Sequence, residues 1–212
     1  YVGGPWRTFR GAQVAGYLAA LGGNPPPAGA AAALFIGNND YLRAASTPEA
    51  PADLIAAVLG NVQSAAQQLL AAGVGEIILF TLPGIDISPL GAALGAAGVA
   101  GYDQIVQANN AGLAQIAAGL AAAGADVEVV DTYRFFTEMK NDVGTFGFEV
   151  TAVPVIDPLG NPTGVSALFD PDEIAFFDLV HPTAALHGVT AAYVSAVLGA
   201  DKVVLRDAGA NT

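Results

Sequence analysis

The sequence has no cysteine and only two histidines among its 212 residues. Without cysteine there can be no thiol nucleophile, no cysteine-ligated zinc site and no disulfide bond. Two histidines without cysteine form no recognisable metal cluster, so we expect no metal site. Any chemistry must therefore come from a small set of side chains, and the surroundings of each histidine become informative.

Positive charge is also scarce. The chain carries 7 Lys and Arg residues against 19 Asp and Glu residues, a formal net charge of −12. Such a surface repels phosphate backbones, so we expect no nucleic-acid partner. The acidic balance fits an exported protein, and we expect a secreted or extracellular location, although many cytosolic proteins are equally acidic.

Long strongly apolar runs are missing, although hydrophobic residues make up 53% of the chain. No stretch reaches the roughly 18 residues of a membrane-spanning helix, so we predict no membrane span. The length suffices for one domain with a sizeable core. We assign residues 1–199 to that domain and 200–212 to a linker that could lead to a further module.

Apolar spacing along the chain alternates between strand and helix patterns. It predicts helices over 13–21, from 46–48 to 73, over 103–123, over 133–140 and from 182 onward, and strands over 31–36, 76–83 and 126–131. Residues 84–101 are expected to be a Gly/Ala-rich connection and 141–172 a long irregular loop. The alternation indicates a parallel sheet with helices on both faces, whose strands end at one ligand-binding edge.

The stretch "FFDLVHPT" at 176–183 sets Asp178 three positions before His181. A carboxylate at this spacing can accept the imidazole Nδ1–H, which fixes the tautomer and leaves Nε2 free to act as a base. Pro182 and Thr183 then begin a helix that would anchor the histidine. The spacing alone favours the plainer alternative, a surface histidine beside an acid, because Asp-x-x-His is common by chance.

A second polar stretch, "FIGNNDYL" at 35–42, follows the first predicted strand. An Asn side chain fixed at a strand end can donate a hydrogen bond to a developing oxyanion. Gly, Asn and Asp are also the residues that ordinary turns favour, so this stretch alone does not decide between the two.

Together, the two stretches resemble two blocks of one family. "GNND" is similar to the Gly-x-Asn-Asp block, and "DLVHPT" to the Asp-x-x-His-Pro-Thr block, of the SGNH hydrolases, or GDSL lipases and esterases. "YVGG" at the start resembles the end of their glycine block, and the likeness runs over roughly residues 1–198. It implies a three-layer, flavodoxin-like α/β fold that lacks its first strand here.

The resemblance also implies roles. His181 would be the general base, oriented by Asp178. The side chain of Asn39 and the backbone N–H of Gly4, or of Gly3 in its place, would donate to the oxyanion. Asp40 would brace the turn, and His187 would be a packed or surface residue without a catalytic role.

One family feature is missing, namely the Gly-Asp-Ser block that carries the nucleophile. None of the five serines follows a strand in a Gly-Asp context: Ser46, Ser64, Ser88, Ser166 and Ser195. We expect a chain shortened at its N-terminus, with a preceding segment supplying the serine. Cleavage into two products, or true loss of the reaction, are the alternatives. Strand 31–36 would then be an unpaired edge, prone to association.

The sequence therefore predicts a serine hydrolase that cleaves small-molecule or lipid carboxylic esters through an acyl-enzyme, a reaction for which we expect no metal or organic cofactor. The alternatives are a catalytically inactive binding domain of the same fold, a thioesterase and a polysaccharide deacetylase. Substrate choice would lie in loops 84–101 and 141–172, whose apolar character favours lipid-like acyl groups. The tail resembles the lead-in to calcium-binding repeats, which are not part of this sequence.

Overall fold

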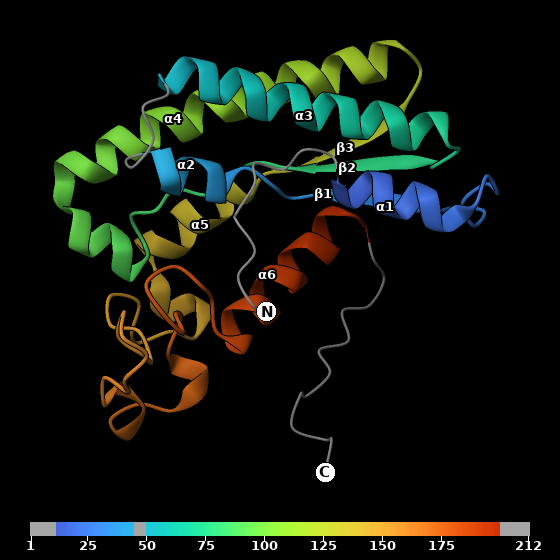
Figure 1. Cartoon of the computed structure of the whole chain (residues 1–212). Helices are drawn as coiled ribbons and strands as arrows, with labels where there is room; N and C mark the ends of the chain where they lie inside the picture. Colours follow the sequence, from blue (N-terminus) through green and yellow to red (C-terminus); the bar gives the residue numbers. More distant parts are fainter. Residues whose placement is uncertain (1–11, 45–49, 200–212) are drawn as a thin grey trace. The chain divides into compact units, whose positions relative to one another are not determined.

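The computed structural model describes residues 12–44 and 50–199. They fall into two compact units. Unit 1 comprises the described residues up to Leu82 together with Tyr102–Thr132, and unit 2 comprises Pro83–Gly101 together with the described residues from Tyr133 onward. Figure 1 follows the elements along the chain. Each unit is described by itself.

Unit 1 contains a three-stranded parallel sheet. Strands β1 (Ala31–Leu34), β2 (Glu76–Phe80) and β3 (Asp126–Val130) lie in the order β1-β2-β3. The register pairs residue 31 with 76 and residue 76 with 126, so the strands start level and their carboxyl ends share one edge. The three predicted strands and the parallel α/β class are confirmed. In the described part of the sheet, β1 pairs only with β2 and lies at an end.

The core of unit 1 lies on one face of this sheet. Ile77 and Leu79 of β2 are fully buried and belong to a cluster with residues of α1 (Ala12–Leu21), α3 (Pro51–Ala71) and the second half of α4 (Pro89–Ala122). In Figure 1, α3 and this half of α4 run alongside the strands. Alternate residues of a strand point to opposite faces. Ile78 therefore belongs to the other face, where it too is buried.

Helix α3 is the one described helix that is long and apolar enough to cross a membrane by length and composition. Its buried residues are Leu54, Val58, Val62, Ala65, Ala66 and Leu69, spaced as one helical stripe. Four of these six residues belong to the sheet cluster. A core helix of a globular unit passes the same test, and the expected absence of a membrane span stays a prediction.

Two boundaries differ from the sequence prediction. Asn38–Ala44 forms a helix, α2, where we predicted a turn. Helix α3 begins at Pro51 after Ala50, which makes no side-chain capping bond, whereas we predicted a start at 46–48. Proline at the first helical position suits that start, because its missing N–H has no helical partner there. Ser46 and Thr47 lie outside the described residues.

The predicted connection 84–101 is wrong, since α4 begins within it at Pro89. Gly95 interrupts this helix with φ 65° and ψ 179°, a conformation that glycine adopts readily. The Gly/Ala content that suggested a connection therefore marks a kinked helix instead.

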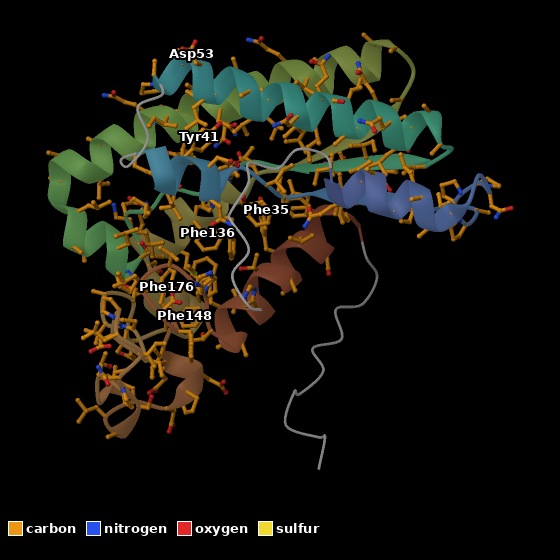
Figure 2. All side chains as sticks on the ribbon, in the orientation of Figure 1. Phe35, Tyr41, Asp53, Phe136, Phe148 and Phe176 are labelled. Carbon is orange, nitrogen blue, oxygen red and sulfur yellow. The ribbon has the colours of Figure 1, made fainter. Side chains whose placement is uncertain are left out.

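Unit 2 has its own apolar core. Helices α5 (Thr132–Asn141) and α6 (Ala184–Val197) contribute Phe135, Phe136, Met139 and Leu186, and the segment between them contributes Phe148, Ala175 and Phe176. Figure 2 labels Phe136, Phe148 and Phe176 within this region. Between the helices lie only short 3-10 turns, η1 (Val143–Phe146), η2 (Val165–Ala167) and η3 (Pro171–Glu173), with isolated bridges. The predicted irregular loop over 141–172 is largely confirmed, although it starts after Asn141.

Candidate active site

The loop that carries Asp178 and His181 is closed by hydrogen bonds at its base. Phe177 N–H donates to the carbonyl of His181 at 2.8 Å, and Phe176 forms a bridge with Pro182. Thr183 then caps α6, because its hydroxyl accepts from Leu186 N–H at 3.4 Å and donates to the carbonyl of Ile174 at 2.7 Å. The loop is thus fixed between the core of unit 2 and the first turn of α6.

Asp178 is the centre of this loop. Its Oδ1 accepts from Val180 N–H at 2.9 Å and from His181 N–H at 2.8 Å. Its Oδ2 lies 2.7 Å from His181 Nδ1. Partial burial pushes the pKa of Asp178 upward, but the hydrogen bonds from Val180 and His181 outweigh it, so the pKa lies below its usual value. Asp178 is therefore a carboxylate at neutral pH.

That carboxylate determines the tautomer of His181. An ionised carboxylate can only accept, so Nδ1 must carry the proton and Nε2 is left as the nitrogen that can take one. The His181 side chain is 71% exposed, and Asp178 is its only side-chain hydrogen-bond partner in the described part of the chain. The structure places the two residues in contact, and their catalytic roles stay predictions.

A neighbouring hairpin supports the same loop from the other side. Val155 N–H donates to Phe176 and Ile156 N–H to Phe177, at 3.1 and 2.9 Å. The tip of the hairpin is held by Asp157, whose pKa is lowered, first by the backbone and side-chain N–H groups of Asn161 and then by the N–H of Leu159. Backbone pairing thus connects the predicted specificity loop directly to the residues before His181.

Asn39 lies in the first turn of α2, just after the carboxyl end of β1. Its side chain is exposed. Before it, Gly37 has φ 122°, and a Cβ there would lie 3.1 Å from Leu82 Cδ1 and 3.2 Å from Val58 Cγ1. The positive φ favours glycine here, and a larger residue would also crowd these two side chains. Asn39 belongs to unit 1, and its convergence with His181 stays a prediction.

Four polar residues around α2 escaped the sequence analysis. Tyr41 O–H donates to Asn109 Oδ1 at 2.7 Å, and Tyr102 O–H donates to Asn38 Oδ1 at 3.1 Å. Asn110 accepts from Leu82 N–H at 2.8 Å and donates to the Leu82 carbonyl at 2.9 Å. The sequence held one signal: Asn109 and Asn110 lie four and three positions before Leu113 and so share the inward face of the predicted helix, where buried polar groups need partners.

The other predicted residues are placed as follows. Gly4 and Gly3 lie outside the described residues. Asp40 is half-buried, and its N–H donates to Gly37 at 3.0 Å at the start of α2. His187 is exposed on α6.

None of the described serines bonds to His181. Ser88 is buried, donates to the Ile85 carbonyl at 2.6 Å and accepts from Gly91 N–H at 3.2 Å. Ser64 lies within α3, Ser166 in η2 and Ser195 within α6. Ser46 lies outside the described residues. Within residues 12–44 and 50–199, no three His, Asp or Glu side chains gather as metal ligands.

The parallel sheet with its helices makes the chain an α/β protein, and an imidazole hydrogen-bonded to a carboxylate is an arrangement that serine hydrolases use. Within that class, the family model described as GDSL-like Lipase/Acylhydrolase matches residues 10–194. The chain therefore belongs to this family, in agreement with the resemblance seen in its motifs. Membership indicates acylhydrolase activity of the lipase and esterase type. No curated protein matches the chain.

Proposed function

We propose that this chain is the body of a serine hydrolase that cleaves small-molecule or lipid carboxylic esters through an acyl-enzyme. The contact between Asp178 Oδ2 and His181 Nδ1, at 2.7 Å, carries the proposal. It leaves Nε2 able to remove a proton from a nucleophilic hydroxyl and later to return it to the leaving alcohol.

The remaining parts follow the family resemblance. The amide of Asn39 and the backbone N–H of Gly4 donate to the negatively charged oxygen of the tetrahedral intermediate. The nucleophile is the serine of a Gly-Asp-Ser block outside this sequence. This is supported by the four described serines, none of which hydrogen-bonds to His181. The proposed location is extracellular, and the reaction needs no metal.

In the proposed reaction, the acyl group passes from the ester to the serine and then to water. The serine oxygen bonds to the ester carbonyl carbon while His181 Nε2 accepts the hydroxyl proton, and the alcohol leaves with that proton. Water then attacks the acyl-serine by the same route and releases the carboxylic acid. Asp178 stabilises the imidazolium that forms in each half and is not itself protonated.

The test uses the natural reading frame, extended upstream of Tyr1 to its start codon. The purified product should hydrolyse a short-chain nitrophenyl ester. His181→Ala should reduce kcat by at least about 10³-fold, because the general base is lost. His187→Ala is the matched control and should retain full activity, since this histidine is exposed on α6 and no carboxylate orients its imidazole among the described hydrogen bonds.

Three outcomes would change the assignment. Retained activity in His181→Ala would remove that residue from its role. A reading frame without a Gly-Asp-Ser block, whose product binds ester ligands without turnover, would favour an inactive binding domain. Turnover of acyl thioesters or acetylated polysaccharide in preference to nitrophenyl esters would reassign the substrate class.

A further inference from the structure

We propose that the hydrogen-bond chain Tyr41–Asn109–Asn110 is a positioning device that holds the exposed amide of Asn39 in place for oxyanion binding. The inference rests on the proposed function and deepens it. None of the three residues is proposed to touch substrate. They would act through Asn39 and are therefore positioning residues.

Helix α2 cannot define its own position. It has seven residues, and isolated helices shorter than about 12 residues are marginal in water. Successive helical residues are rotated by about 100°, so Asn39 and Tyr41 project on roughly opposite sides of the helix. The structure agrees, since Asn39 is exposed and Tyr41 is 2% exposed. An anchor on Tyr41 therefore fixes the direction of Asn39 without obstructing it.

The anchor is a continuous chain of hydrogen bonds. Tyr41 O–H donates to Asn109 Oδ1 at 2.7 Å, and Asn109 Nδ2–H donates to Asn110 Oδ1 at 3.3 Å. Asn110 in turn pairs with both the N–H and the carbonyl of Leu82, directly after β2. Asn109 is 2% exposed, so its amide has no water to replace a lost partner. The chain thus connects α2 to the carboxyl end of the sheet, where ligands bind in open α/β folds.

Two further contacts restrict α2 at its start. Tyr102 O–H donates to Asn38 Oδ1 at 3.1 Å, and Gly37 lies against Leu82 and Val58. Burial, and then the nearby Asp40 and Tyr102, raise the pKa of Tyr41, so its hydroxyl stays a donor throughout the pH range of ester hydrolysis. A phenylalanine at position 41 would fill the same space, which makes a purely packing role distinguishable from a directional one.

The test is Tyr41→Phe in the product of the natural reading frame, with Tyr17→Phe on α1 as the matched control. The loss of the hydroxyl should reduce kcat for a nitrophenyl ester about tenfold while KM changes little, because misplaced donors act on the transition state. Tyr17, which is 39% exposed and outside the chain of bonds, should have no effect.

A double-mutant comparison separates positioning from general damage. In an Asn39→Ala background, Tyr41→Phe should cause no further loss, because the group it positions is already gone. A full tenfold loss in that background, or unchanged kinetics of Tyr41→Phe in an active wild type, would overturn the inference. Asn109→Ala should behave in the same way, with a loss of kcat in the wild type and no further loss in the Asn39→Ala background. Urea unfolding checks that this variant folds.

A second measurement does not depend on activity. Backbone amides of α2 in the product of the natural reading frame should exchange with solvent severalfold faster in Tyr41→Phe than in Tyr17→Phe, because the helix loses its anchor. Equal exchange would refute the anchoring step. A wild type without any esterase activity would instead refute the proposed function and the oxyanion role with it, and the exchange result would still show whether Tyr41 anchors α2.

Discussion

Replacing Asp178 by Asn tests the central contact with the smallest possible change. The substitution keeps the shape of the side chain and one acceptor oxygen. Oδ1 can still accept from Val180 and His181 N–H, which lie at 2.9 and 2.8 Å. The atom that replaces Oδ2 is an NH2 group, which then faces His181 Nδ1 at 2.7 Å. Two donors would meet there, so the imidazole must change tautomer.

The expected loss of stability and activity follows from the one hydrogen bond that is lost, between the residue 178 side chain and His181 Nδ1. A hydrogen bond to a charged group contributes about 1.5–3 kcal/mol when it is buried. His181 is 71% exposed, so solvent screening reduces this to about 1 kcal/mol of unfolding free energy. The effect on catalysis should be far larger, about 10⁴-fold in kcat, because the new tautomer carries its proton on Nε2 and cannot act as a base.

The assay for the tautomer is nitrogen NMR of the imidazoles of His181 and His187 in the product of the natural reading frame near pH 8. In the wild type, His181 should show a protonated Nδ1 and an unprotonated Nε2, and Asp178→Asn should reverse this pattern. His187 is the second histidine and serves as an internal control that should not change. The same His181 tautomer in both proteins would refute the argument that Asp178 sets the base.

Three further predictions concern stability and association. The pKa of Asp178 is lower in the folded chain than its unfolded-state pKa of about 4, so the ionised carboxylate stabilises the folded state above that pH. This stabilisation is lost as the pH falls through the lower folded-state pKa. The melting temperature should therefore fall less between pH 6 and 2 in Asp178→Asn than in the wild type, as thermal melts would show. Gly37→Ala should lose about 1–3 kcal/mol of unfolding free energy, because position 37 has φ 122° and the new Cβ would crowd Leu82. Gly60→Ala, in open space on α3, should instead gain up to about 1 kcal/mol. Urea unfolding measures both, and equal effects of the two substitutions would contradict this expectation. Residues 1–212 should associate through the β1 edge, and Ala33→Lys should shift light-scattering mass toward the monomer; a monodisperse wild-type monomer would be the contrary result.

Local patterns explain which parts of the fold were predictable. The strands at 31–34, 76–80 and 126–130 stand out as short apolar runs bounded by Gly, Asp or Pro, and their periodicity is a local property. Helix α2 was missed because "GNND" favours turns, and the burial of Tyr41, which accompanies the helix, is not visible in the local pattern. The first part of α4 was missed because Ala and Gly carry little periodic signal.

In the candidate site, a contact between residues close in sequence was predictable, and a contact between distant residues was not. Asp178 and His181 are three residues apart, so their contact could be inferred from sequence alone. Tyr41 and Asn109 are 68 residues apart, and no local pattern predicts their pairing. Contacts of that separation depend on how β1, β2 and α4 are brought together by the fold, which residue spacing does not encode.

The most direct test of the account is a crystal structure of the natural reading-frame product inhibited by a phosphonate ester. The account predicts a phosphonate bonded to a serine of a Gly-Asp-Ser block. His181 Nε2 and the Asn39 amide should both lie within about 3 Å of its oxygens, as expected for a base and an oxyanion donor serving one reaction. A structure in which His181 and Asn39 face separate regions of solvent, with the inhibitor touching only one of them, would contradict it.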